Sequence, residues 1–144
     1  MSRGNRPRKA VKGGTDTSGE ELFVIRALQK EELTPGKLAP SHSAAYVPFH
    51  GRECAHRDYE VLVADCNLEW VKCGSDSEKL PPGSIQGGYT KDGEPLYIGR
   101  AQHRDSVTCG KVRWSSKTCY LSWGGQEHLY QTFEVLTYQT IDLD

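Results

Sequence analysis

Residues 93–101 read GEPLYIGRA, and residues 19–27, which lie 74 positions earlier, read GEELFVIRA. The same offset holds without a gap between residues 13–62 and residues 87–136, where 17 of 50 positions are identical. A gapless match of this length indicates an internal duplication and not the chance similarity of a glycine-rich chain. The fold is therefore expected to consist of two copies of one structural unit.

Each copy contains short apolar segments that are typical of β-strands. Residues 22–25 and 96–99 are apolar runs that follow Ser-Gly and Asp-Gly dipeptides, which favour the turn of a hairpin. Residues 59–63 and 133–137 alternate between apolar and polar side chains, as half-buried strands do. No segment shows a sustained period of 3.6 residues, so the sequence predicts an all-β protein built from antiparallel strands.

The two copies differ at their beginnings. Residues 68–72, which include Trp70, predict an additional strand ahead of the second copy, whereas the position equivalent to Trp70 would precede the start of the chain. The first copy is therefore expected to lack this lead strand. Five of the first twelve residues are basic, and we expect residues 1–10 to form a flexible basic arm. The predicted domains are this arm, repeat 1 at residues 11–66 and repeat 2 at residues 67–144.

Composition and charge exclude several classes of protein. The chain has 144 residues, with 18 Lys and Arg against 19 Asp and Glu, and this balance argues against nucleic acid as a specific partner. No run of about 18 apolar residues predicts a membrane span. No apolar segment follows the basic N-terminus, as it would in a secretory signal. We expect a cytoplasmic protein that is released, if at all, by an unconventional route.

Catalytic and metal-binding arrangements are weak. Side chains of the types that bind zinc occur at His42, His50, Cys54 and His56, but their spacing matches no compact ligand pattern and repeat 2 does not retain the set. No metal or other cofactor is therefore expected. No nucleophile stands in a recognisable motif, so we expect no enzyme activity. Five cysteines without a Cys-x-x-Cys pair predict reduced thiols.

A set of motifs, most of them in repeat 2, carries a resemblance to a known family. The motifs are Trp70-Val71, Leu80-Pro81-Pro82-Gly83-Ser84-Ile85, Gly87-Gly88, residues 93–101, Gly110-Lys111-Val112, Gly124-Gly125-Gln126-Glu127 and Phe133-Glu134-Val135-Leu136. In this order they resemble the DM-nine repeat, a domain shared by natterin-like proteins and mannose-specific DM-nine lectins. The resemblance covers a tandem pair of repeats over residues 11–138.

The resemblance implies both a fold and a function. It implies two antiparallel β subdomains, one per repeat, related by a pseudo-two-fold axis. It also implies a lectin that recognises mannose or mannose-containing glycans, acts in agglutination or pattern recognition, and forms homodimers. The sugar contacts of the family fall here on Asp16 and Lys37, and in repeat 2 on Thr90 and Lys111. Because Thr90 stands where the family has an aspartate, the second site is expected to be weaker.

The chemistry of these residues leaves two interpretations open. Asp16 and Lys37 suit a sugar diol, because a carboxylate accepts and an ammonium donates hydrogen bonds to neighbouring hydroxyls. The alternative is that they form a simple surface ion pair. Glu53 and Glu127 occupy equivalent positions after an aromatic strand end. We predict that they either support the two lysines from a second layer or accept bonds from local turn amides.

Two further alternatives concern the aromatic residues and the function itself. Trp114, Trp123 and Tyr46 are able to stack on a sugar face, although aromatic residues of a small β domain usually pack in its core. The alternative function is an intracellular protein-interaction or stress-response adaptor that binds no sugar.

Overall fold

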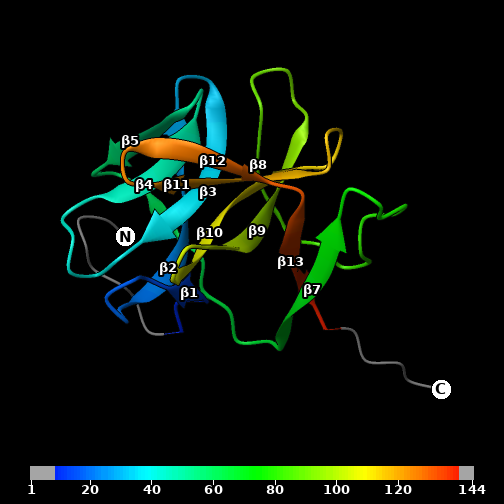
Figure 1. Ribbon diagram of the computed structural model, residues 1–144, viewed down its shortest axis with the longest axis horizontal. Helices are drawn as coiled ribbons and strands as arrows, with labels where there is room; N and C mark the ends of the chain where they lie inside the picture. Colours follow the sequence, from blue (N-terminus) through cyan, green and yellow to red (C-terminus); the bar gives the residue numbers. More distant parts are fainter. Residues whose placement is uncertain (1–8, 140–144) are drawn as a thin grey trace.

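The computed structural model describes residues 9–139, which form thirteen β-strands and no helix (Figure 1). The strands are β1 (Lys12–Thr15), β2 (Glu21–Gln29), β3 (Glu32–Leu38), β4 (Ala45–Phe49), β5 (Arg52–His56), β6 (Glu60–Val61), β7 (Leu68–Gly74), β8 (Gln86–Tyr89), β9 (Pro95–His103), β10 (Ser106–Arg113), β11 (Thr118–Trp123), β12 (Gln126–Tyr130) and β13 (Thr132–Tyr138). All of the strand pairings are antiparallel, so the all-β fold expected from the sequence is confirmed. The described part of the chain holds no helix with the length and apolarity needed to cross a membrane.

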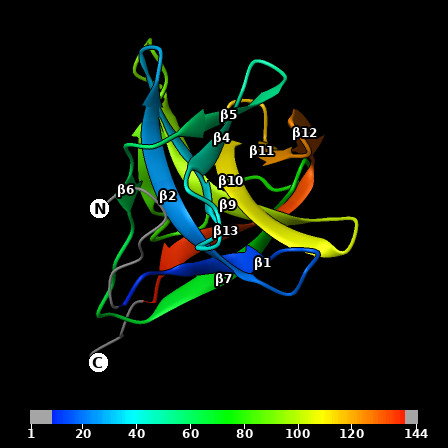
Figure 2. The ribbon, with the colours of Figure 1, turned by 90° about the vertical axis from the view of Figure 1, so that its left-hand side faces the viewer.

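Six strands close into a central barrel. Repeat 1 contributes β1, β2 and β3, and repeat 2 contributes β8, β9 and β10. Figure 2 shows β1, β2, β9 and β10 curving around it. The barrel closes where β3 pairs with β8 at Leu33 and Tyr89, and where β1 pairs with β10 at Thr15 and Val107. The two closing pairs are related by the repeat offset of 74. The pseudo-two-fold relation that the family resemblance implied is therefore present, and the two repeats share one barrel.

Glycine permits the two closing pairings. A Cβ atom at Gly88 would lie 1.9 Å from the carbonyl oxygen of Leu33, and one at Gly14 would lie 1.8 Å from the carbonyl oxygen of Val107. Both distances are far below van der Waals contact, so no other residue fits at either position. This close approach explains the second glycine of the Gly-Gly pair that begins each repeat.

Two outer hairpins, β4–β5 and β11–β12, meet on one side of the barrel (Figure 1). The backbone amide of Glu53 donates to the carbonyl of Gly125 at 3.1 Å, and the amide of Glu127 donates to the carbonyl of Gly51 at 3.0 Å. The side chains repeat this exchange, because Glu127 Oε1 accepts from the Gly51 amide and Glu53 Oε1 accepts from the Gly125 amide. Each outer hairpin is thus held by a glutamate of the other repeat.

Strands β6, β13 and β7 complete the sheet. β13 pairs with β9 on one edge and with β7 on the other. β6 takes the equivalent place in repeat 1, where it pairs with β2. Within residues 9–139, no strand pairs with the outer edge of β6. Repeat 1 therefore lacks a described counterpart of β7.

Three clusters of buried apolar side chains form the core. One cluster lies in each repeat, between the barrel and the outer hairpin of that repeat. The third cluster draws on both repeats and includes Val24 of β2, Ile98 of β9, Cys109 of β10 and Leu136 of β13, with Trp70 of β7 packed against it. Because this shared cluster is made by both repeats, neither repeat buries its apolar surface alone.

The structure describes only part of the predicted basic arm and does not describe the last five residues. Of the predicted basic arm, residues 1–8 lie outside the described residues, whereas Ala10 pairs with Val63. Residues 140–144 also lie outside the described residues.

All five cysteines are free thiols. Burial raises the pKa of Cys109 to about 12, so this thiol stays protonated and weakly nucleophilic.

Candidate functional site

Asp16 lies in the tight turn between β1 and β2. Its backbone amide donates to the carbonyl of Glu20 at 2.8 Å, and the amide of Gly19 donates to the carbonyl of Asp16 at 2.9 Å. The carboxylate is also fixed, because Oδ1 accepts a hydrogen bond from the Thr17 amide at 2.8 Å. An ionised carboxylate offers about four acceptor positions, so this bond leaves acceptor capacity for a ligand.

Lys37 lies on β3, opposite Tyr46 of β4. Its ammonium donates to the backbone carbonyl of Ser122 at 2.5 Å and forms an ion pair with Glu53 Oε2 at 3.1 Å. Both charged side chains are only 12% exposed. An ammonium has three donors, so two are used by the protein and one is left for a ligand.

Asp16 and Lys37 line one cavity of about 320 Å³. Part of its wall comes from repeat 2, through Trp123 at the end of β11 and the adjacent Gly124. The other lining residues are Thr17, Leu22, Ala39, His42, Tyr46 and Glu53. The structure therefore brings the two predicted side chains to one cavity, and the ion pair of Lys37 is made with Glu53 and not with Asp16.

This cavity combines three kinds of contact that suit a small polyol. Asp16 supplies a charged acceptor, and Lys37 supplies a charged donor. Charge-assisted hydrogen bonds of this kind are shorter and stronger than neutral ones. Trp123 adds an indole, whose apolar face packs against C–H groups. Trp114, in contrast, packs against the core cluster of repeat 2.

An aromatic cluster packs against Trp123. The ring centroid of His103 lies 5.0 Å from that of Trp123 and 4.2 Å from that of His128. His103 Nδ1 is hydrogen-bonded to the hydroxyl of Tyr130, whereas its buried Nε2 has no hydrogen-bond partner among residues 9–139. Burial lowers the pKa of His103, and electrostatic interactions with His128, Arg104 and Lys37 lower it further. The imidazole beside the cavity is therefore neutral at pH 7.

The equivalent position in repeat 2 is built differently. Thr90 stands in place of the aspartate, and its buried hydroxyl accepts a hydrogen bond from the Glu94 amide at 3.1 Å. Lys111 Nζ pairs with Glu32 Oε2 at 2.7 Å and lies 3.9 Å from Glu127 Oε2. The cavity of about 740 Å³ at this position is lined by Thr90 and Glu32 but not by Lys111. The second lysine is thus enclosed by carboxylates.

The sequence did not identify Glu32, which pairs with Lys111, or Ser122, whose carbonyl binds Lys37. Each of these partners lies in the opposite repeat from its lysine. Neither contact follows from the repeat pattern, because each crosses between the repeats and depends on how β3, β10 and β11 are arranged in space. One signal was present. At the offset of 74, Glu32 corresponds to Ser106, so the carboxylate at the start of β3 has no counterpart at the start of β10.

The structure also places the residues considered for metal binding. His42 lines the Asp16 cavity, whereas His56 Nε2 is hydrogen-bonded to Gln29 Oε1 at 2.7 Å. In the described range, residues 9–139, no group of three or more His, Cys, Asp or Glu side chains is arranged to hold a metal ion.

Comparison with known proteins adds two findings. The family described as the DM9 repeat matches residues 1–56, 16–130 and 97–143 of the chain. Natterin-3 of Thalassophryne nattereri is 37% identical over 71 residues, which make up 49% of this chain. The same match covers 16% of natterin-3, so the chain spans only a small part of the length of that relative.

Proposed function

This chain belongs to the DM9 repeat family, and from that premise we propose that it is a lectin-like protein that binds mannose-type glycans. Membership of this family and the similarity to natterin-3 support a lectin-like role. The observation that carries the proposal is the single cavity in which Asp16 and Lys37 lie beside Trp123.

In this proposal, the sugar is held by two neighbouring hydroxyls. Asp16 accepts a hydrogen bond from one hydroxyl, and the remaining proton of the Lys37 ammonium is donated to the next. Both hydroxyls must reach their partners at once, so the relative orientation of the hydroxyls on the ring decides the fit. Mannose differs from glucose only in the orientation of one hydroxyl, and a site of this kind is able to separate the two.

Agglutination requires more than one open site per particle. Lys37 lines the cavity at its position, whereas Lys111 is paired with Glu32 and does not line the cavity at the equivalent position, so we propose one sugar site per chain. We propose that a homodimer supplies the second sugar site, since linking two weak sites raises the effective affinity for a branched glycan. Sedimentation together with agglutination of mannan-coated beads tests this step. Agglutination by a strictly monomeric chain would contradict it.

The main test is the substitution Asp16→Asn, with mannose binding measured by calorimetry. Asparagine keeps an oxygen that can accept from the Thr17 amide, so the turn should survive, but the charge is lost. Hydrogen bonds to charged groups contribute about 1.5–3 kcal/mol, so we expect binding to weaken by about tenfold or more.

Asp76→Asn is the matched control, because Asp76 is exposed in the loop after β7 and lines neither cavity. It makes the same change of charge and should leave binding unaltered. Equal affinity of the Asp16→Asn variant and the unmodified chain for mannose would remove Asp16 from the site. Binding of no hexose by the unmodified chain would reject the proposed function.

A further inference from the structure

The outer edge of β13 is covered along its whole length, whereas among residues 9–139 no strand pairs with the equivalent edge in repeat 1. β7 pairs with β13 from Thr132 opposite Gly74 to Tyr138 opposite Leu68. The offset of 74 places the equivalent segment of repeat 1 at residues 58–64. In the described range, that segment lies at the end of the sheet order.

Two residues of this segment direct backbone groups away from the barrel. Leu62 donates to the carbonyl of Val24 at 3.0 Å and accepts from the amide of Val11 at 2.9 Å, so its polar groups face the barrel. Successive residues of a strand direct their N–H and C=O groups to opposite edges, so Val61 and Val63 direct theirs outward. An exposed edge of this kind is a template for strand addition.

The side chains show the same difference between the repeats. Val63 is 50% exposed, whereas its counterpart Thr137 is 2% exposed beneath β7. The ion pair of Arg26 with Glu60 has side chains that are 42% and 68% exposed. The equivalent pair of Arg100 with Glu134 has values of 24% and 29%. The difference corresponds to the cover that β7 gives to repeat 2.

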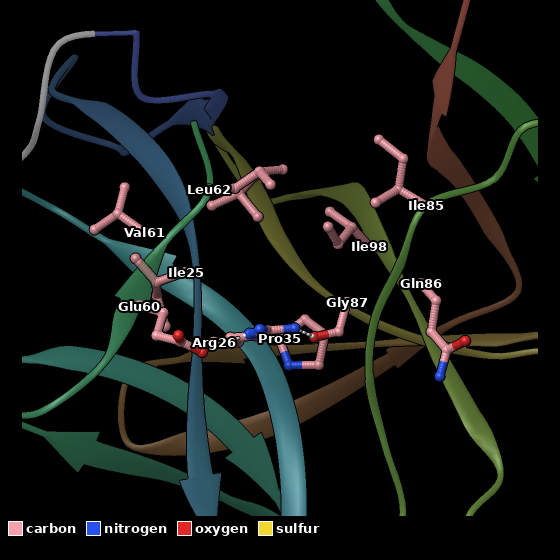
Figure 3. Close-up of a pocket in the computed structure, with 11 residues that line it drawn as sticks. Ile25, Arg26, Pro35, Glu60, Val61, Leu62, Ile85, Gln86, Gly87 and Ile98 are labelled. Atoms are coloured by element: carbon pink, nitrogen blue, oxygen red, sulfur yellow. Dashed lines mark hydrogen bonds and ion pairs between the residues drawn. The ribbon is translucent and has the colours of Figure 1, made fainter. Parts of the chain in front are cut away.

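Trp70 is the side chain of β7 that packs against Arg100 and the core. Its ring lies 4.3 Å from the Arg100 guanidinium, and it packs against the core cluster shared by the repeats. In repeat 1, a cavity of about 200 Å³ lies beside Arg26. Figure 3 shows Arg26 and Glu60 on one side of this cavity and the apolar side chains of Leu62 and Ile98 on another.

We propose that residues 60–64 and the cavity beside Arg26 form a docking site for an extended segment of another polypeptide, which adds as a strand to β6. The pairing of β7 with β13 indicates which side chains the docked segment needs. Trp70 lies opposite Leu136, and Lys72 lies opposite Glu134. The docked segment therefore places an aromatic side chain opposite Leu62, over the Arg26 guanidinium, and a basic side chain two residues later opposite Glu60.

Residues 1–8 of this chain do not have the chemistry of that occupant. Their sequence, MSRGNRPR, contains no aromatic side chain to take the place of Trp70. Residues 140–144, TIDLD, contain no aromatic side chain either, so neither undescribed segment supplies the counterpart of Trp70. The site is separate from the Asp16 cavity and shares no lining residue with it, so its test does not depend on sugar binding.

The test uses the full chain and a synthetic peptide with the sequence of residues 67–74, carrying Cys73→Ser to prevent oxidation. Calorimetry should show saturable binding of one peptide per chain. Amide shifts in NMR spectra should be confined to residues 24–26, 58–64 and 85–87. The same peptide with Trp70→Ala should bind at least about tenfold more weakly, because the indole supplies most of the buried area.

Two protein variants sharpen the result. Arg26→Met keeps an unbranched side chain but removes the cation. It should weaken binding of the peptide that contains Trp70 more than it weakens binding of the Trp70→Ala peptide. The Asp16→Asn variant should bind the peptide as the unmodified chain does, which separates this site from the sugar cavity.

Several outcomes would overturn the proposal. These are no saturation at millimolar peptide, equal affinity for the Trp70→Ala peptide, or shifts centred on residues 132–138, which would indicate exchange with β7. Binding that appears only after deletion of residues 1–8 would also overturn it, because the chain would then cover its own edge.

Discussion

At the scale of single residues, one carboxylate distinguishes the surroundings of Lys111 from those of Lys37. Glu32 pairs with Lys111 at 2.7 Å and leaves it enclosed. The counterpart Ser106 donates to the backbone carbonyl of His103 at 2.7 Å instead. Lys37 is therefore free of a second carboxylate at that position. The two sites differ in availability as well as in the exchange of aspartate for threonine.

We predict that Thr90→Asp alone is insufficient to create a second sugar site, and that Thr90→Asp combined with Glu32→Ser creates one. The double variant gives repeat 2 the aspartate of the first cavity and removes the carboxylate that pairs with Lys111. Calorimetric titration with mannose should then show two sites per chain where the unmodified chain shows one. A stoichiometry unchanged in the double variant, with the fold intact, would contradict the role assigned to Glu32.

A second prediction at this scale concerns pH. The pKa of His103 is below its ordinary value of 6.5, mainly because burial disfavours the imidazolium. The unfolded chain therefore binds the proton more tightly than the folded chain. Stability should be complete above the ordinary pKa and should fall as the pH drops from that value through the lowered pKa of the folded state.

The substitution His103→Gln tests this link. Glutamine already occupies the equivalent position as Gln29, where it is hydrogen-bonded to His56, so it should be accommodated. Urea unfolding between about pH 7.5 and about pH 5.5 should show a smaller loss of unfolding free energy in the variant. A residual loss is expected, because burial also lowers the pKa of His56. An identical loss in both proteins would rule out His103 as the titrating group.

The sequence indicated which side chains meet at the candidate cavity better than it indicated their partners. The family resemblance assigned Asp16 and Lys37, and the structure brings both to one cavity. It did not reveal that Ser122 binds Lys37 or that Trp123 completes the wall, because both lie in the other repeat. Contacts between repeats depend on the closure of the barrel, and an offset between two copies carries no information about that closure.

At the scale of strands, the sequence predicted those with clear hydrophobic patterns and missed those that carry the lysines. Residues 22–25 and 96–99 lie in β2 and β9, and the turns before them are present. No strand was predicted at β3, since Pro35-Gly36 is typical of turns. The structure needs glycine there because a Cβ at Gly36 would lie 2.2 Å from the carbonyl oxygen of Tyr46. Close packing of the β4 backbone therefore overrides local propensity.

The barrel closure leads to a prediction for Gly88→Ala. The added Cβ would lie 1.9 Å from the Leu33 carbonyl, and a backbone atom cannot move aside as a side chain does. We expect a loss of about 3 kcal/mol in unfolding free energy, seen as a lower midpoint in thermal or urea unfolding.

Gly93→Asn is the control for this variant. Gly93 has a φ of 90° and open space around its Cβ position, and asparagine tolerates such turns. It should lower the unfolding free energy much less than Gly88→Ala does. Equal stability of the two variants would show that the closing pair between β3 and β8 is not closely packed.

At the scale of the whole molecule, the repeats do not form independent bodies. The barrel takes three strands from each, and the shared core cluster draws on both. We predict that residues 1–66 expressed alone do not form a folded monomer. Circular dichroism should show no cooperative thermal transition, or size-exclusion chromatography should show self-association. A cooperatively folded monomer would contradict the shared barrel.

The exchange of glutamates between the outer hairpins has a consequence for how such a molecule diversifies. Two separate single-repeat chains would be able to make the same exchange as a symmetric pair, but every substitution would then appear in both halves at once. A glutamate at position 32 would neutralise, on each side, the lysine that we propose as a sugar ligand. Joining the halves covalently removes that constraint, so one pocket is able to lose its aspartate and acquire a blocking carboxylate while its twin stays open.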